Sequence, residues 1–231
     1  IKISKNKKTV DDVYGLFLKK ASVMLCDLSS SNYAQEALII SGSIKDDFKK
    51  IRDKKIGIVI FSPPYANCFD YCEVYKMELW MGDFVRTYGD FKKYRDIAVR
   101  SHVNATFDHA IKHRNYKVDV IADTISCFNI WNKNIPDMIR GYFDDMTQVF
   151  EKLCAGMVKG AKCFIVVANS GYRGILVPTD LLFADIGQQV GFKVVEIILA
   201  RKMRASSQQM KELNGKYENL MRESIVVLEK I

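Results

Sequence analysis

The residues Ser62-Pro63-Pro64-Tyr65, called the SPPY motif below, combine a hydroxyl, a rigid backbone and an aromatic ring. Neither proline has a backbone N–H, so the chain must leave a preceding strand in a stiff, extended turn. The Ser62 hydroxyl and the Pro63 carbonyl could accept hydrogen bonds from an exocyclic amino group, while the Tyr65 ring stacks on the base that carries it. The motif therefore suits a planar base taken out of a nucleic-acid duplex.

Two simpler interpretations of Ser62 have to be weighed. A motif of this length can arise by chance, and it would then be only a rigid turn between a strand and a loop. A serine hydrolase would need a Gly-x-Ser-x-Gly elbow and a partner histidine, and the sequence has no such elbow. We therefore expect Ser62 to orient a substrate group and not to act as a nucleophile.

The residues around the motif resemble a known family. The SPPY motif is similar to the catalytic motif of the amino-group DNA methyltransferases, which transfer a methyl group from S-adenosylmethionine to cytosine N4 or adenine N6. In residues 61–82 the family pattern continues through an Asn, an Asp-Tyr pair and a Lys-x-Glu-Leu-Trp segment. The segments that resemble the flanking parts of the family are 39–46, 143–173 and 222–228. Together the matches span most of residues 37–230.

The resemblance implies roles for single residues. The motif residues Ser62, Pro63, Pro64 and Tyr65 would be catalytic, and a serine at the first position is more typical of cytosine N4 enzymes than of adenine N6 enzymes. We favour cytosine N4, with adenine N6 as the alternative. Drawing the amine hydrogens to Ser62 and Pro63 makes the nitrogen more tetrahedral and directs its lone pair at the sulfonium methyl group. The residues expected to bind the cofactor are Ser43, Asp46 and Phe61, and Asn67 is expected to contact the substrate DNA.

The sequence departs from the family in the cofactor-binding region. The glycine-rich turn that normally holds the methionine part of the cofactor is absent, and the nearest glycine cluster, 171–174, reads as a loop after the wrong strand. Ser43 stands where the family has an acidic residue, and Asp46 lies three residues further on. An upstream segment of a longer enzyme or a second subunit would then supply the glycine-rich cofactor loop. Otherwise the chain is a non-catalytic DNA-binding relative.

Basic residues favour a polyanionic partner, which we expect to be double-stranded DNA. The formal net charge is +8, and residues 85–117 hold eight Lys and Arg against three Asp, with Tyr, Phe and His between them. This stretch lies in a predicted insertion, 85–135, and a second basic cluster at 201–204 leads into an expected mobile loop, 206–215. For any single residue a solvated basic surface is an equal alternative. The candidate DNA-contacting cations are Lys92, Lys93, Arg95, Arg100, Arg173, Arg201 and Arg204.

Helix and strand signals alternate along the chain, which predicts an α/β fold. Apolar spacing predicts a helix over 11–28 with Asp11 near its N-cap, and the apolar run 56–61 predicts a strand buried on both faces. Irregular helices and loops are expected over 84–130. The other predicted elements are a strand at 37–40, a helix at 46–53, a helix at 138–157 capped by Lys159-Gly160, a strand at 161–168, a helix at 179–190 closed by Gly191, and strands at 192–199 and 224–229.

These elements and the resemblance predict one methyltransferase domain over 1–231, present in part. We expect the Rossmann-like sheet of an S-adenosylmethionine-dependent methyltransferase. The sheet should be mostly parallel with an antiparallel last strand, and incomplete on its N-terminal side. Methylation of RNA or protein is a weaker alternative, because the continuation of the motif resembles the DNA enzymes. A role in a restriction-modification system is expected.

The composition excludes several other classes. With 48% hydrophobic and 27% charged residues, the 231-residue chain fits a globular domain and not a disordered one. No apolar run approaches the ~18 residues of a membrane span and no secretion signal opens the chain, so we expect a cytoplasmic protein. The cysteines are scattered and imply no disulfide framework. Cys68 and Cys72 have no second CxxC or HxxxH pair at zinc-finger spacing, although His109 and His113 lie four positions apart, so no metal is expected.

Overall fold

The computed structural model describes residues 12–29, 37–105, 110–203 and 217–231. The chain divides into two compact units, Ile1–Ser41 and Gly42–Ile231, and each is described by itself. Among the described residues, no helix has the length and apolar character needed to cross a membrane. The second unit carries the SPPY motif.

The first unit contains the helix α1, Val13–Ser29. Asp12 precedes it and accepts a 2.7 Å hydrogen bond from the backbone N–H of Gly15, which satisfies a donor of the first turn. The predicted helix is thus confirmed, although its predicted N-cap, Asp11, lies outside the described residues. Residues 37–40 are irregular, so the strand predicted there is wrong. No described strand offers them a hydrogen-bonding partner.

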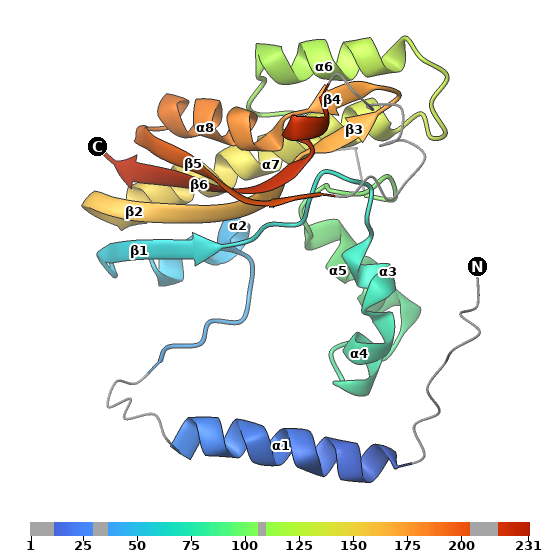
Figure 1. The fold of residues 1–231 in the computed structure, drawn as a ribbon, viewed down its shortest axis with the longest axis vertical. Coiled ribbons are helices and arrows are strands. Elements are labelled where there is room, and N and C mark those ends of the chain that lie inside the picture. Colours follow the sequence, from blue (N-terminus) through green and yellow to red (C-terminus); the bar gives the residue numbers. More distant parts are fainter. Residues whose placement is uncertain (1–11, 30–36, 106–109, 204–216) are drawn as a thin grey trace. The chain divides into compact units, whose positions relative to one another are not determined.

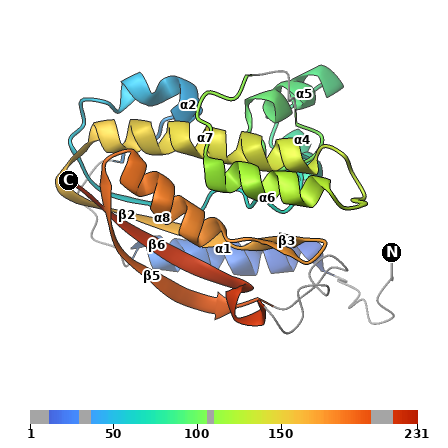
Figure 2. The same ribbon diagram turned by 90° about the horizontal axis from the view of Figure 1, so that it is seen from above.

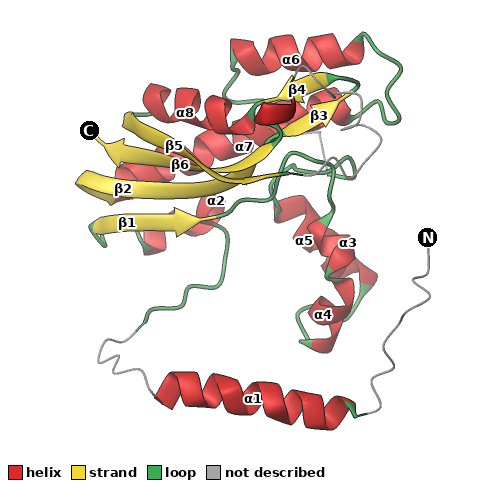
Figure 3. Cartoon of the chain, viewed as in Figure 1, coloured by secondary structure: helices red, strands yellow, loops and turns green. Residues whose placement is uncertain are grey.

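The second unit is built on a sheet with the strand order β1-β2-β6-β5 (Figures 1 and 3). Its strands are β1 Ile56–Phe61, β2 Met157–Ala168, β5 Phe192–Lys202 and β6 Arg222–Lys230. β1 pairs in parallel with β2, and β6 runs antiparallel to both β2 and β5. Three strands therefore point the same way and the last strand points back, as predicted. The carboxyl ends of β1, β2 and β5 lie at the same end of the sheet as the start of β6.

Helices lie on one side of this sheet (Figure 2). They are α2 Ile44–Asp47 with a 3₁₀ turn at Phe48–Lys50, α6 Tyr116–Ser126, α7 Ile135–Gly156 and α8 Thr179–Gln189. The core forms where α7 and α8 meet the sheet. There Phe183 of α8 packs on Tyr142, Phe143 and Phe150 of α7, with ring centroids 5.1 to 6.0 Å apart.

The helix α7 runs into β2 without a loop, since the helix ends at Gly156 and the strand begins at Met157. The predicted cap at Lys159-Gly160 and the predicted strand start at 161 are therefore wrong. The register explains this, because Ile56 pairs with Met157 but Ile58 pairs with Lys162. The extra residues of β2 bulge between these pairs, and Gly160 adopts a φ of +80° there, which glycine tolerates.

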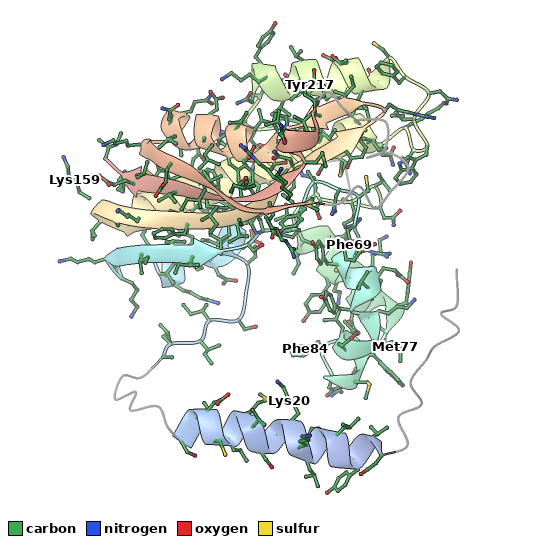
Figure 4. All side chains as sticks on the ribbon, viewed as in Figure 1. Lys20, Phe69, Met77, Phe84, Lys159 and Tyr217 are labelled. Carbon is green, nitrogen blue, oxygen red and sulfur yellow. The ribbon has the colours of Figure 1, made fainter. Side chains whose placement is uncertain are left out.

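Three short helices follow the SPPY motif: α3 Tyr71–Val74, α4 Lys76–Met81 and α5 Tyr88–Ile97. The side chains of Thr87 and Asp90 form a capping box at the start of α5. Phe69, Met77 and Phe84 lie along this segment and are largely exposed (Figure 4). The helices and loops predicted over 84–130 are thus confirmed for the described residues.

A hairpin follows β2, with β3 Ser170–Tyr172 pairing with β4 Ile175–Val177. Arg173 and Gly174 connect the strands and have φ values of 49° and 75°, as a two-residue hairpin turn requires. The glycine cluster 171–174 is therefore a strand end and a tight turn. From the sequence, this cluster is interpreted as a loop and not as the glycine-rich turn that holds the cofactor, and the hairpin agrees with that interpretation.

β1 lies at one edge of the sheet (Figure 1). Val59 and Phe61 pack against the core, whereas the alternating Ile58 and Ile60 are 58% and 70% exposed. The prediction that this strand is buried on both faces is therefore wrong within the second unit, because no described layer of that unit covers the face with Ile58 and Ile60. Among the described residues, the outer edge of β1 has no paired strand.

Candidate active site

The SPPY motif lies at the carboxyl end of β1, as predicted. Ser62 is the first residue after the strand and is exposed, while Pro63 is buried. The Ser62 hydroxyl donates a 3.1 Å hydrogen bond to the backbone carbonyl of Val166 on β2. Because the hydroxyl proton is used in this bond, the lone pairs of Ser62 Oγ stay available to accept hydrogens from a bound group.

The half-buried ring of Tyr65 is held at its hydroxyl, which donates a 2.5 Å hydrogen bond to Oε1 of Glu223. Burial, followed by this hydrogen bond, raises the pKa of Tyr65 to about 12, and the nearby Ser62 hydroxyl acts in the opposite direction. Tyr65 is therefore a neutral phenol at physiological pH. It can offer its ring for stacking, but it is not a phenolate base.

No role for Glu223 is expected from the sequence alone. The register places it opposite Ala168 of β2 and Arg201 of β5. Arg201 Nε lies 2.6 Å from Glu223 Oε2. The hydrogen bond from Tyr65 and then that from Arg201 lower the pKa of Glu223 despite partial burial, so Glu223 is charged. Its position within 222–228, where the chain resembles the last strand of a family, was the only signal in the sequence.

The loop after the motif is anchored to the hairpin. Tyr172 Oη donates a 2.8 Å hydrogen bond to the carbonyl of Ala66, and Cys68 Sγ lies 3.3 Å from the same hydroxyl. Burial raises the pKa of Cys68 to about 11, so this residue is a thiol and not a reactive thiolate. In the described parts of the chain, no three His, Cys, Asp or Glu side chains are placed to hold a metal ion.

Asp70 connects the motif loop to α5. Its carboxylate caps α3 by accepting a 3.1 Å hydrogen bond from the backbone N–H of Glu73, and it lies 2.6 Å from Arg95 Nη2. Burial alone would raise the pKa of Asp70. The hydrogen bond from Glu73 and the charges of His102 and Arg95 outweigh burial, so the pKa of Asp70 is lowered. The Arg95 side chain is only 15% exposed. This guanidinium is thus paired with Asp70, and the DNA contact expected for Arg95 stays a prediction.

Arg100 is buried against α7. Its Nη2 lies 2.6 Å from Asp144 Oδ2 and 2.9 Å from Asp145 Oδ1, and Lys45 Nζ lies 3.2 Å from the same Asp145 oxygen. Arg100 and Lys45 together therefore balance the charges of two buried carboxylates. The Arg100 guanidinium is thus paired with two carboxylates of α7, and the DNA contact expected for Arg100 stays a prediction.

Other predicted DNA-contacting residues lie at the surface. Lys92 and Lys93 are exposed on α5. Arg173 is exposed in the hairpin turn, where its Nε donates a 2.8 Å hydrogen bond to the carbonyl of Asn129. Asn67 is exposed and holds its own loop, since its Oδ1 accepts a 3.1 Å bond from the backbone N–H of Phe69. Arg204 and the loop 206–215 lie outside the described residues.

The predicted cofactor-binding residues lie on two separate elements. Ser43 is the N-cap of α2, and its hydroxyl accepts a 3.2 Å hydrogen bond from the backbone N–H of Lys45. Asp46 is exposed in the same helix. Phe61 ends β1 and is half-buried. Ser43 and Asp46 therefore lie in the same turn at α2, whereas Phe61 lies at the end of β1, next to the SPPY motif.

A cavity of about 550 Å³ lies beside Asp46, between α2, α5 and α7. Its walls include the ion-paired Lys45, Arg100 and Asp145, but neither Phe61 nor Ser62 lines it. Of the residues predicted to bind S-adenosylmethionine, Phe61 is the one next to Ser62 in the chain.

Comparison with curated proteins finds methyltransferases. The chain is 29% identical over 223 residues to the type II methyltransferase M.BsoBI of Geobacillus stearothermophilus, a match that covers 83% of the chain and 42% of that protein. It is 25% identical over 170 residues to the type II methyltransferase M.AvaI of Nostoc sp., covering 68% of the chain and 35% of that protein. The chain thus spans less than half the length of the curated relatives it matches.

Among solved structures, TTHA0409 of Thermus thermophilus, a putative DNA modification methylase, matches with a TM-score of 0.40 and 12% identity over 82% of this chain and 52% of that one. Its complex with S-adenosyl-L-methionine matches with a TM-score of 0.42 and 13% identity over 82% and 53%. No family model matches the sequence. By sequence, the chain is similar over most of its length to a part of the type II methyltransferases.

Proposed function

We propose that the chain is the catalytic part of a site-specific DNA methyltransferase that acts on the exocyclic amino group of a base. The observation that carries this proposal is the exposed Ser62 beside Tyr65 at the carboxyl end of β1, where open α/β sheets bind ligands. The similarity to M.BsoBI and M.AvaI, both type II methyltransferases, supports it. A Rossmann-like domain over 1–231, present in part, and a role in a restriction-modification system belong to the same proposal.

In this proposal Ser62 and Pro63 orient the amino group of the base. The Ser62 oxygen, whose proton is engaged by Val166, and the Pro63 carbonyl accept the two amine hydrogens. This fixes the nitrogen and makes it more tetrahedral, with its lone pair turned out of the base plane. The ring of Tyr65 stacks on the base after it leaves the duplex. S-adenosylmethionine, when bound, supplies an electrophilic methyl group.

Cytosine N4 is the favoured target, because a serine at the first motif position is more typical of cytosine N4 enzymes. Adenine N6 is the alternative, since both amines present two hydrogens to Ser62 and Pro63. The methylated base itself distinguishes them.

We also propose that a further segment completes the cofactor site. Asp46 offers a carboxylate and Phe61 an apolar wall, but the sequence has no glycine-rich turn. The edge of β1, which no strand pairs with among the described residues, and the exposed Ile58 and Ile60 support this proposal, because parallel sheets normally carry further strands and a helical layer at such positions. A second subunit or an upstream segment with the glycine-rich turn would pair with the edge of β1 and cover the face that carries Ile58 and Ile60.

DNA binding is proposed for the basic residues that the structure leaves at the surface. The members of this set are Lys92 and Lys93 on α5, Arg173 in the hairpin turn and Arg201 near the end of β5. They would contact phosphates, which positions the duplex without reading its sequence. The inserted segment 85–135 then serves both to hold the motif loop, through Arg95, and to contact DNA, through α5.

A non-catalytic DNA-binding subunit of the same fold is the second candidate. The missing glycine-rich turn favours it. This candidate predicts DNA binding without methyl transfer.

Calorimetry distinguishes the two candidates. S-adenosylmethionine binding is measured for the chain alone and after addition of the adjoining segment or neighbouring protein that carries a glycine-rich turn. We expect binding and methyl transfer to unmethylated DNA in the mixture only. Binding by the chain alone would mean that its own residues form the cofactor site, and no binding in either sample would favour the non-catalytic candidate.

Variants of the exposed apolar residues test the completing segment. Ile60→Lys should abolish cofactor binding in the mixture, because a charge on this edge strand opposes strand pairing. Leu181→Lys, at an exposed apolar position on α8, is the matched control and should leave binding intact. Equal binding by both variants would rule out β1 as the attachment site.

A further inference from the structure

A chain of hydrogen bonds crosses the end of the sheet beside the SPPY motif. Tyr65 Oη donates a 2.5 Å hydrogen bond to Glu223 Oε1, and Arg201 Nε lies 2.6 Å from Glu223 Oε2. The Glu223 side chain is only 12% exposed, whereas that of Arg201 is 71% exposed. The carboxylate is therefore held between a ring hydroxyl inside the site and a guanidinium at the surface.

This arrangement leaves Tyr65 little conformational freedom. Pro63 and Pro64 fix the backbone that leads to it. The far end of its ring is held by a hydrogen bond to a charged acceptor, which is the stronger kind. A ring that is ordered before it meets a ligand loses less conformational entropy when the ligand stacks on it.

We propose that Glu223, held in place by Arg201, is a positioning residue that fixes the ring of Tyr65 in the orientation for stacking on the substrate base. The inference rests on the proposed function, which gives the ring a base to stack on. Glu223 acts through Tyr65 and does not itself contact the base. Arg201 binds the second carboxylate oxygen and so keeps Glu223 from rotating away.

The preceding residue provides a matched control. Arg222 points to the opposite face of β6, where its Nε lies 2.8 Å from Oδ2 of the fully buried Asp180. Asp180 also accepts a 2.9 Å hydrogen bond from Ser224. Loss of the Arg222–Asp180 pair should weaken the fold without changing the tether of Tyr65.

The first test is a double-mutant cycle on methyl transfer, measured with the chain together with the segment that completes its cofactor site. Glu223→Met and Tyr65→Phe should each lower kcat by about 10- to 100-fold with a small change in the KM for DNA. The double variant should be no worse than either single variant, because both remove the same bond. Glu223→Gln keeps an acceptor for Tyr65 and should retain part of the rate. Arg222→Gln should lower the melting temperature but not the kcat of the folded protein.

The second test does not depend on catalysis. In spectra of the chain with ¹³C-labelled tyrosine, the Tyr65 ring signals are assigned by their loss in Tyr65→Phe. Ring flipping of Tyr65 should be faster in Glu223→Met than in the wild type, and unchanged in Arg222→Gln. Unchanged ring motion in Glu223→Met, or rate losses that multiply in the double variant, would overturn the positioning role.

The outcomes also separate this inference from the proposed function. If the wild type transfers methyl groups and Glu223→Met transfers them equally well, only the positioning role fails. If the wild type transfers none in the presence of the completing segment, the proposed function fails, and the catalytic meaning of the Glu223 tether fails with it.

Discussion

Ser62 Oγ and the carbonyl oxygen of Val166 lie 3.1 Å apart, joining the residue after β1 to the neighbouring strand. The bond uses the serine proton and leaves an acceptor exposed at the carboxyl end of the sheet. Such an oxygen suits the hydrogens of an amine. It does not suit a nucleophile, which needs a base within reach of its proton.

Replacing Ser62 by alanine tests this role directly. Ser62→Ala should lower the rate of methyl transfer by about 10²- to 10³-fold, the usual cost of one positioned hydrogen-bonding group. The melting temperature should change little, because Ser62 is exposed. Ser126→Ala, which removes another exposed hydroxyl bonded to a backbone carbonyl, is the control and should keep the full rate. A Ser62→Ala variant as active as this control would refute the orienting role.

The lysines of α5 should contribute to DNA affinity through phosphates. The double variant Lys92→Ala/Lys93→Ala should bind a mixed-sequence duplex more weakly. The slope of log affinity against log salt should fall in magnitude by about 0.9 for each phosphate that the variant no longer neutralises. Lys159→Ala is the control. Lys159 lies at the far end of the sheet from Phe69, which belongs to the segment that leads into α5 (Figure 4). Equal salt dependence for all three proteins would remove α5 from the DNA-binding surface.

The buried ion pairs of Arg100 should matter for stability. Arg100→Met leaves Asp144 and Asp145 without their main partner and should lower the free energy of unfolding by about 3–5 kcal/mol in urea denaturation. Arg86→Met breaks an exposed pair with Asp83 and should change it little. If the two variants were equally stable, the Arg100 cluster would not have the structural role that its burial implies.

His102 should make the fold sensitive to mild acid. Burial, followed by the charge of Arg95, lowers the pKa of His102 below 6.5, although Asp70 opposes the shift. The unfolded chain then takes up a proton more readily than the folded chain, so stability that is present above pH 6.5 is lost as the pH falls from that value through the lower pKa of His102 in the folded chain. Between about pH 7.5 and about pH 5, urea denaturation should show a larger loss of unfolding free energy for the wild type than for His102→Gln. Parallel pH profiles for the two proteins would contradict this account.

Local patterns were enough to predict the strand that carries the motif. The run 56–61 is bounded by Lys55 and by the proline pair, so apolar character and the missing N–H groups define β1 without further information. The end of α8 was predicted for a similar reason, since Gly191 has a φ of +102° that favours glycine.

Features that depend on distant partners could not be predicted in this way. Tyr65 and Glu223 are 158 positions apart, and only the antiparallel return of β6 brings them together. The charge pattern counted Arg95 and Arg100 as surface cations, because it contains no information about the carboxylates that other elements place beside them. The exposure of Ile60 likewise depends on which layers cover β1 and not on its own sequence.

The identity of the methylated base tests the central claim most directly. The gene, expressed with its neighbouring genes in a host strain that lacks DNA methylation, yields DNA that is hydrolysed to nucleosides and analysed by mass spectrometry. We predict N4-methylcytosine in DNA from the wild type and its loss with Ser62→Ala, while N6-methyladenine would assign the enzyme to the alternative base. DNA that carries neither modified base, although the completing segment is expressed, would contradict the account.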